Sequence, residues 1–206
     1  MIFILLIFLV ILLLIWLDHN YLAKMKKWSY FVSQSGMTGA EIAKQLLLKY
    51  ELSGIQIIIA DGEFTDNYDP NKKTIGLSQD IYYGNSLVAV AIAAHEVGHA
   101  KCDQQNKMIM KVRSRLGPYI SFLVAIMPVL LISALIFGGA IFLLFICLVL
   151  IIVVFHVLTI YVEIDASKRA FQMLVKQNVI MKEEHYAVKE TLTSAAATYV
   201  TAMFKW

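Results

Sequence analysis

Charged residues are scarce in this chain of 206 residues, where they make up 16% of the sequence. An average soluble protein has about 25%. Two long stretches, residues 1–17 and 118–162, contain no Lys, Arg, Asp or Glu at all. This uneven distribution excludes an ordinary soluble globular domain. The net charge is only +3, and no basic stripe or aromatic platform accompanies it, which argues against nucleic acid as a partner.

Cysteine is also scarce. The chain has two cysteines, Cys102 and Cys147, and the second lies inside the uncharged stretch 118–162. A disulfide framework of the kind that holds small secreted domains together is therefore excluded. We expect both thiols to be free, as they are in a reducing cytosol.

The first uncharged stretch, residues 1–17, consists almost wholly of Ile, Leu, Phe and Val. As a helix it would span roughly 25 Å, the short end of what crosses a bilayer. Trp16 and Tyr21 lie where interfacial aromatic residues are expected. A cleaved signal peptide is the rival interpretation, but the stretch lacks a basic start and a small-residue cleavage site. We therefore predict a retained transmembrane anchor over residues 1–17.

The second uncharged stretch, residues 118–162, is too long for one membrane span and suits two spans joined by a minimal turn. Gly138-Gly139 lies near its middle and is the natural turn. We predict spans over about 119–137 and 141–161. Pro128 is expected to kink the first of them.

The basic residues predict how the chain is oriented. Of the 18 Lys and Arg residues, twelve lie in residues 18–117 and six in 163–206. Three spans place both segments on the same side of the membrane, and short basic segments stay in the cytoplasm. We therefore predict a multi-pass protein of the cell membrane in four parts: the anchor (1–17), a cytoplasmic part (18–117), the two-span hairpin (118–162) and C-terminal helices (163–206).

The cytoplasmic part has signals for both helices and strands. Residues 18–36 are interpreted as a linker at the membrane surface. Thr38 and Glu41 fit a capping box, which predicts a helix to about Tyr50. Asn85 or Ser86 is expected to cap a second helix over 87–103. Between them, three β-prone runs predict a small antiparallel sheet, with strands at 55–60, 63–68 and 73–78.

The second predicted helix carries the sequence His95-Glu96-Val97-Gly98-His99. Residues four apart share a helix face, so His95 and His99 can direct both imidazoles at one metal ion. Glu96 lies about 100° round the helix, where it can reach a water on the metal without being a ligand. Zinc lowers the pKa of such a water toward 7, and the carboxylate accepts its proton during attack on a peptide carbonyl. The motif therefore predicts a zinc metallopeptidase.

A catalytic zinc site needs a third protein ligand. The metzincin pattern would place Gly at 102 and His at 105, but Cys102 and Gln105 stand there. After Asp103, the next acidic residue is Glu163, at the point where the second hairpin span returns to the cytoplasm. Asp165 is the alternative ligand, but it faces nearly the opposite way and can pair with Arg169.

The chain resembles the YugP-like neutral zinc metallopeptidases, membrane proteins in the same broad group as HtpX and the CAAX prenyl endopeptidases. The resemblance covers about residues 30 to 202. The matching stretches are Gly36-Met37-Thr38-Gly39-Ala40-Glu41, Thr65-Asp66-Asn67-Tyr68-Asp69-Pro70, Leu77-Ser78, Ala93-Ala94-His95-Glu96-Val97-Gly98-His99-Ala100, Glu163-Ile164-Asp165-Ala166-Ser167-Lys168-Arg169-Ala170 and Thr198-Tyr199-Val200.

The resemblance implies a zinc ion held by His95, His99 and Glu163, with Glu96 as the general base. Together with the segments described above, we predict a mostly α membrane protein with an anchor helix, a small antiparallel sheet, zincin-type helices and a two-span hairpin. Relatives often have Glu-x-x-Ala-Asp at the third ligand, where the Asp orients a histidine. This chain has Ser167 in that place, so either the surroundings of the ligands differ or Asp103 supplies the carboxylate.

Three further groups are candidates for a role. A peptidase needs a donor for the oxyanion of the transition state, for which Tyr199 is our candidate and His185 or Tyr186 the rivals. His156 lies inside a predicted span, where it either hydrogen-bonds within the helix bundle or acts directly. Asp69-Pro70 is primarily a turn signal; because relatives share it, the resemblance also implies that this loop borders the substrate cleft.

Three functions are compatible with these residues. The leading one is an endopeptidase for membrane-associated proteins or peptides, whose substrate adds a strand to the edge of the sheet. An intramembrane protease would need the histidine motif inside a span, and the apolar run before His95 is only eight residues long. The third is a zinc-binding membrane scaffold or regulator without turnover, which the presence of Glu96 disfavours.

Overall fold

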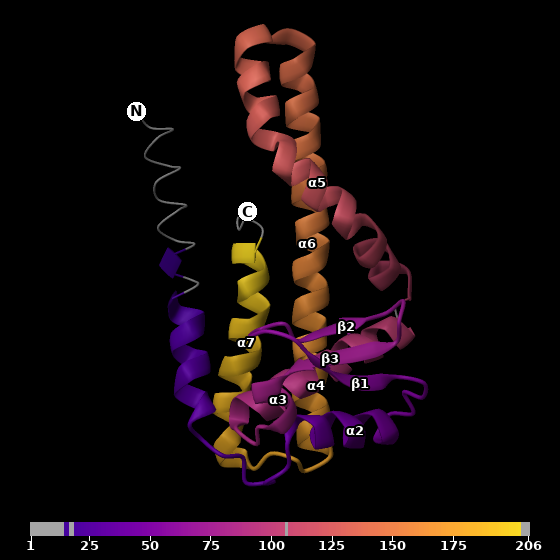
Figure 1. Cartoon of the computed structure of the whole chain (residues 1–206), viewed down its shortest axis with the longest axis vertical. Helices are drawn as coiled ribbons and strands as arrows, with labels where there is room; N and C mark the ends of the chain where they lie inside the picture. Colours follow the sequence, from indigo (N-terminus) through magenta and orange to yellow (C-terminus); the bar gives the residue numbers. More distant parts are fainter. Residues whose placement is uncertain (1–14, 17–18, 106, 203–206) are drawn as a thin grey trace.

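The computed structural model describes residues 15–16, 19–105 and 107–202. The predicted anchor over 1–17 lies outside the described residues, except for Ile15 and Trp16. The ordered elements are α2 (Gly39–Lys49), β1 (Gln56–Ala60), β2 (Asn67–Asp69), β3 (Thr74–Ser78), α3 (Gln79–Tyr83), α4 (Leu87–Gln105), α5 (Lys107–Phe137), α6 (Gly139–Lys176), η1 (Lys182–Glu184) and α7 (His185–Ala202) (Figure 1).

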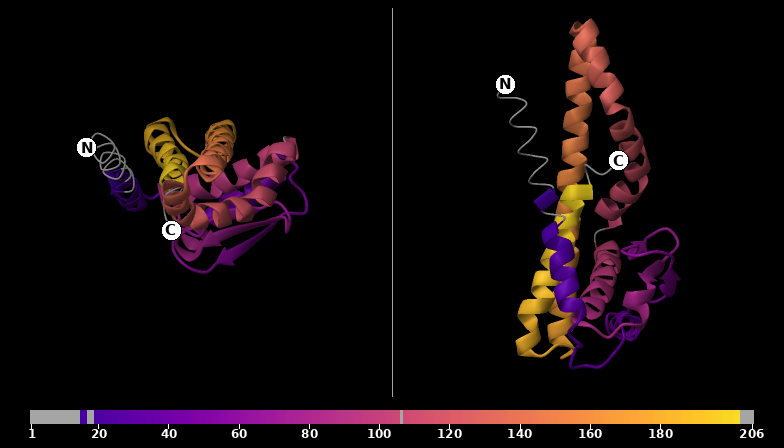
Figure 2. Two further views of the ribbon diagram at one scale, coloured as in Figure 1. Left: turned by 90° about the horizontal axis from the view of Figure 1, so that it is seen from above. Right: turned by 60° about the vertical axis from the view of Figure 1, so that its left-hand side comes forward.

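The predicted linker over 18–36 is wrong in its first half, because residues 19–29 are helical. Tyr21, Met25 and Trp28 recur at helical spacing and pack against the core. Trp28 also donates a hydrogen bond from Nε1 to Glu190 of α7, at 2.8 Å. This helix therefore lies beside α7, as both orientations of Figure 2 show.

Three strands form, but the second is β2 at 67–69 and not the predicted 63–68, and the sheet is mixed and not antiparallel. Its order is β1-β3-β2, with β1 parallel to β3 and β2 antiparallel to β3. β3 is buried over Ile75–Ser78 and pairs on both sides, so the short hairpin strand β2 is left at the edge. The sequence signals identify the strands, whereas this order depends on which strand the core buries.

The helix α4 runs through the centre of the molecule, between the sheet on one side and α6 and α7 on the other (Figure 1). Ser86 caps it as predicted, because its Oγ accepts a hydrogen bond from the N–H of Ala89 at 3.1 Å. All of its residues from Leu87 to Ala100 are buried. The other predicted cap, at α2, is a capping box in which Thr38 and Glu41 bond each other's backbone N–H.

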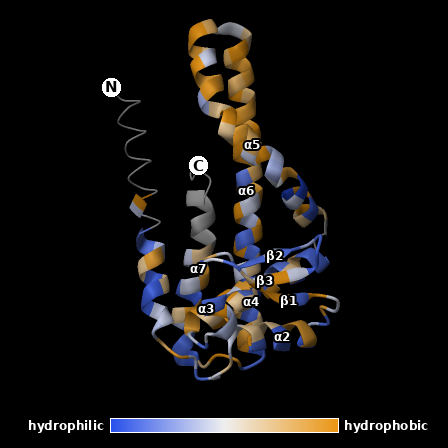
Figure 3. Ribbon diagram, in the orientation of Figure 1, coloured by the Kyte–Doolittle hydropathy of each residue, from blue (hydrophilic) through white to orange (hydrophobic). Residues whose placement is uncertain are grey.

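The helices α5 and α6 form a long hairpin that projects from the rest of the molecule (Figure 1). They meet at Gly138, whose φ of 59° few other residues adopt, so the predicted turn is correct. Both helices are long and apolar enough to cross a membrane. Figure 3 shows that the far end of the hairpin is almost wholly hydrophobic, while the polar segments lie at its base.

The helix boundaries differ from the four predicted parts. α5 begins at Lys107, before the uncharged stretch, and continues through Pro118 and Pro128. α6 continues past the predicted span end to Lys176, so Glu163 belongs to the same helix as the second apolar stretch. Because α6 is one continuous helix, Glu163 lies at a fixed distance from the apolar part of α6 that is long enough to cross a membrane.

Candidate metal centre

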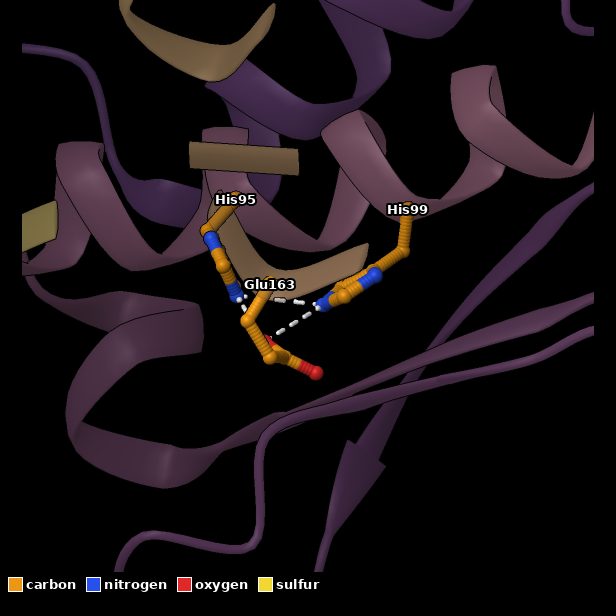
Figure 4. Close-up of side chains that lie close together, drawn as sticks. All are labelled: His95, His99 and Glu163. Carbon is orange, nitrogen blue, oxygen red and sulfur yellow. Dashed lines mark hydrogen bonds and ion pairs between the residues drawn. The ribbon is translucent and has the colours of Figure 1, made fainter. Parts of the chain in front are cut away.

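Three side chains from two helices converge at the centre of the fold. His95 and His99 lie one turn apart on α4, and Glu163 reaches them from α6 (Figure 4). Glu163 Oε2 lies 3.1 Å from His95 Nε2 and 3.2 Å from His99 Nε2, and the two Nε2 atoms are 3.1 Å apart. All three side chains are buried.

These three atoms have the spacing that one zinc ion requires. Zinc binds nitrogen and oxygen at about 2.0–2.1 Å in tetrahedral geometry, which separates neighbouring ligand atoms by about 3.3 Å. The three distances of 3.1–3.2 Å are close to that value. Two imidazoles and one carboxylate are also a donor set of catalytic zinc, which leaves a fourth position for water or substrate. The residues present therefore fit Zn²⁺.

Ser167 fixes the orientation of His95. Its Oγ lies 3.2 Å from His95 Nδ1 and 3.2 Å from the carbonyl oxygen of Leu192. The carbonyl oxygen can only accept, so the single hydroxyl proton is donated to it and the oxygen of Ser167 accepts from the N–H at Nδ1. His95 then presents the lone pair of Nε2 toward Glu163 and the metal position. A serine thus occupies the place where the resemblance led us to expect an aspartate.

The idea that Asp103 supplies a carboxylate to the histidines is wrong. Asp103 accepts a hydrogen bond from the hydroxyl of Tyr68 at 2.9 Å and forms an ion pair with Lys73. Nδ1 of His99 has no hydrogen-bond partner among the described residues. Asp103 instead attaches the hairpin of β2 and β3 to α4.

Arg113 is a residue of the site that the sequence analysis missed. It lies on α5, and its Nη2 is 2.6 Å from Oε1 of Glu163. The guanidinium therefore holds the oxygen of Glu163 that does not face the histidines. Its position 14 residues after His99 gave no signal, because the contact depends on how α5 folds back over α4.

Burial shifts the pKa values of His99 and Glu96, the two polar residues of α4 beside His95. It lowers the pKa of His99 to about 4, so this imidazole is neutral and has a lone pair for a metal. Burial also raises the pKa of Glu96 to about 7, with the charge of Glu163 adding to the effect. A carboxyl with that pKa can both accept and return a proton near neutral pH.

Two cavities meet at this centre, and Glu96 lines both. One, of about 690 Å³, is bounded by His99 and runs between α5 and α6. The other, of about 1110 Å³, is bounded by His95 and opens toward α3 and the helix at 19–29. The edge strand β2 lies beside the first cavity, which Asn67, Tyr68 and Pro70 line. Pro70 is where the sequence analysis placed the border of a cleft.

Most of the other candidates lie away from these two cavities. Asp165 accepts hydrogen bonds from Cys102 and Arg169, at 3.2 and 2.9 Å. His185 packs on Phe171, and Tyr186 is exposed; neither lines these two cavities. The side chain of Tyr199 lies outside the described part of the structure. His156 lines the first cavity, and both cysteines are free, as expected.

The fold and the donor set together define a helical protein with a metal centre of the zinc metallopeptidase type. The sequence matches the family described as "Putative neutral zinc metallopeptidase" over residues 2–205. The chain belongs to this family. Zinc is therefore the metal for which His95, His99 and Glu163 form the site.

One curated relative is the "Putative membrane protease YugP" of Bacillus subtilis. It is 34% identical over 188 residues, which cover 91% of this chain and 84% of the relative. No solved structure gives a significant match to the chain.

Proposed function

We propose that this chain is a zinc-dependent endopeptidase of the membrane, in which Glu96 is the general base. The observation that carries the proposal is that His95, His99 and Glu163 converge where the two cavities meet. Glu96 lines both of these cavities. The family match and the name of the relative support it. A zinc-binding scaffold without turnover would not require a buried carboxyl next to the ligands.

The roles of the protein groups follow from their positions. His95, His99 and Glu163 hold zinc, which when bound acts as a Lewis acid on a peptide carbonyl and on a water molecule. Glu96 accepts a proton from the attacking water and returns it to the leaving amine, because it is the buried carboxyl that lines both cavities beside the ligands. Tyr199 stays our candidate for the oxyanion donor.

The edge strand β2 is the proposed binding surface for the substrate backbone. β2 pairs with β3 on one side only, so its other side offers unpaired backbone groups. An extended peptide that adds to this edge passes the cavity bounded by Glu96 and His99. The sheet can thereby hold a peptide bond in front of the metal position.

The proposed location is the cell membrane, with α5 and α6 spanning it and the metal centre on the cytoplasmic side. The two apolar helices and the basic segments at the base of the hairpin support this orientation. Protease added to sealed inside-out vesicles should cleave at the basic residues of 182–189, and protease added to right-side-out vesicles should not. Cleavage from the outer side alone would reverse the topology.

The test of the catalytic role is Glu96→Gln in the full chain, assayed in liposomes with bound zinc measured in parallel. The variant should keep zinc and lose at least about 99% of peptide hydrolysis, because the amide cannot accept the proton. Glu183→Gln is the matched control, since Glu183 is exposed in η1. Undiminished hydrolysis by Glu96→Gln would refute the assigned base. A wild type that binds zinc but hydrolyses no protein substrate would favour the scaffold.

A further inference from the structure

The cavity between α5 and α6 extends from the metal centre to residues that lie within the proposed membrane spans. Its base is bounded by Glu96 and His99, and its upper part by side chains of α5 and α6 from within the uncharged stretch. On α6 these are Phe155, His156 and Thr159, which lie up to two turns before Glu163. Two turns of helix correspond to about 10 Å along α6. The cavity therefore extends from the metal centre toward the bilayer.

The outer faces of the same helices indicate where the bilayer begins. On α5, Lys111 and Arg115 are exposed, and one turn further Tyr119 and Phe122 are exposed. This order of basic and then aromatic side chains is typical of the headgroup region. Residues of α5 beyond about 117 are thus at the depth of lipid, and the upper cavity lies at the same depth.

Small residues of α5 create the space. Gly117, Ser121 and Ala125 follow one another at intervals of four on the face that lines the cavity. A Cβ added at Gly117 would meet no atom within 4 Å. The total volume of about 690 Å³ is within the range of sites that enclose a ligand of several side chains.

The polar groups on the walls are mostly satisfied by their own helices. Thr159 donates to the carbonyl of Phe155 at 3.0 Å, and Ser114 to that of Lys111 at 3.3 Å. Nδ1 of His156 lies 2.7 Å from the carbonyl of Ile152, to which its N–H donates. Few donors are left to bind a polar ligand, so the upper cavity suits an apolar one.

The cavity on the other side of the metal centre has a different character. Four charged side chains line it, Lys26, Glu63, Asp66 and Asp80, whereas no Lys, Arg, Asp or Glu lines the upper part of the α5–α6 cavity. A peptide bond held at the metal would thus have uncharged surroundings on one side and charged groups on the other. This asymmetry matches a polypeptide at the point where its membrane segment meets its soluble part.

We propose that the α5–α6 cavity is a specificity subsite that receives apolar side chains of a membrane-tethered polypeptide, next to the bond to be cleaved. The proposal rests on the peptidase function proposed above and adds the class of substrate. Enclosing one large apolar side chain favours binding by roughly 10- to 100-fold. The preferred substrate therefore has Leu, Ile or Phe on one side of the cleaved bond and polar residues on the other.

The first test measures binding without turnover. Full-length Glu96→Gln with zinc is placed in liposomes of phosphatidylcholine and phosphatidylglycerol, with a membrane-tethered peptide that carries photoreactive leucines beside its polar part. Crosslinks should fall on the cavity-lining residues, which are Gly117, Ser121 and Ala125 of α5 and Phe155, His156 and Thr159 of α6. Crosslinks confined to outward residues such as Phe122 would overturn the proposal. So would a photoreactive lipid chain that labels the cavity equally with and without the peptide.

The second test fills the cavity. Ala125→Leu should reduce crosslinking of the leucine peptide, and its hydrolysis by the active enzyme, by roughly 10-fold or more. Hydrolysis of a peptide with Gly and Ser in the same positions should be unchanged. The matched control is Ala140→Leu, which is also exposed but lies at the far end of the hairpin and does not line the cavity. Equal effects on both peptides, or none, would refute the subsite, whereas a wild type with crosslinks but no hydrolysis would refute only the peptidase function.

Discussion

Gly98 of α4 packs directly against Ala166 of α6, and a Cβ at Gly98 would overlap the carbonyl oxygen of Ala166. Gly98 lies between the two histidines, and Ala166 lies one turn after Glu163. The backbones of the two helices therefore come together beside the metal centre. The short side chain of glutamate can reach both imidazoles because this contact contains no Cβ.

Gly98→Ala should accordingly impair the metal site. The added methyl group forces α4 and α6 apart, which moves Glu163 away from the histidine nitrogens. We expect zinc affinity to fall by at least about 10-fold, as for changes that misplace a ligand. The measurement is competition with a chromophoric chelator.

Gly117→Ala in α5 provides the control, because its new Cβ meets nothing within 4 Å. Alanine is favoured over glycine in a helix interior by about 1 kcal/mol. This variant should keep wild-type zinc affinity and unfold at the same or a higher temperature. Equal zinc affinities for Gly98→Ala and the wild type would show that the helix contact does not set the ligand geometry.

The second prediction concerns which carboxylate, that of Glu163 or that of Asp165, is the third zinc ligand. Glu163→Gln replaces the oxygen that lies 3.1–3.2 Å from both imidazoles with a neutral amide, a poor zinc ligand. We expect zinc affinity to fall by more than about 100-fold, beyond the range for residues that only orient a ligand.

Asp165→Asn is the matched control for that change. Asp165 lies two residues further on and bonds Cys102 and Arg169. Zinc affinity should stay near the wild-type value in this variant. A larger loss from Asp165→Asn than from Glu163→Gln, in isothermal titration with zinc, would reverse the ligand assignment.

The sequence was sufficient to predict most of what brings the site together. Helix periodicity placed His95 and His99 on one face, and the absence of acidic residues between Asp103 and Glu163 left few third ligands. The long uncharged stretch with Gly138-Gly139 at its middle predicted the hairpin that carries Glu163 back. Each of these inferences depends on local spacing or on a simple fold-back.

The parts that the sequence did not predict depend on contacts between distant segments. The order β1-β3-β2 depends on which strand the core buries. The sequences of the strands alone are equally compatible with an antiparallel sheet. Arg113 of α5 forms an ion pair with Glu163 of α6, and Ser167 of α6 donates a hydrogen bond to the backbone carbonyl of Leu192 in α7. Pairings at such separations leave no periodic signal in one sequence.

Ser167 gives the third prediction. Ser167→Ala removes the acceptor for Nδ1 of His95 and leaves that buried nitrogen without its partner. Zinc affinity should fall by about 10- to 100-fold with little change in the fold. Ser133→Ala is the control, because Ser133 bonds only the carbonyl of Val129 in its own helix, at 2.9 Å. Chelator competition that shows equal affinities for the two variants would exclude a role for Ser167 in orienting the ligand.

Tyr68 gives the fourth prediction, which concerns the edge strand. Its hydroxyl donates to the buried carboxylate of Asp103 at 2.9 Å and accepts from Lys73 at 3.2 Å. Burial, first of all, raises the pKa of this phenol to about 12, so it is protonated at neutral pH and can act as the donor. The bond ties β2 to the end of α4 that follows the histidines.

Tyr68→Phe should therefore loosen the substrate-binding edge without touching the metal ligands. Loss of one hydrogen bond to a charged, buried acceptor costs about 1–3 kcal/mol, which thermal unfolding in detergent can detect. Zinc affinity should be unchanged, while KM for a peptide substrate rises more than kcat falls, since β2 positions the peptide. Tyr30→Phe, at an exposed tyrosine, controls for the loss of a hydroxyl. If Tyr68→Phe lowered kcat and left KM unchanged, the hydroxyl would act in the chemical step, and β2 would not be the edge that holds the substrate.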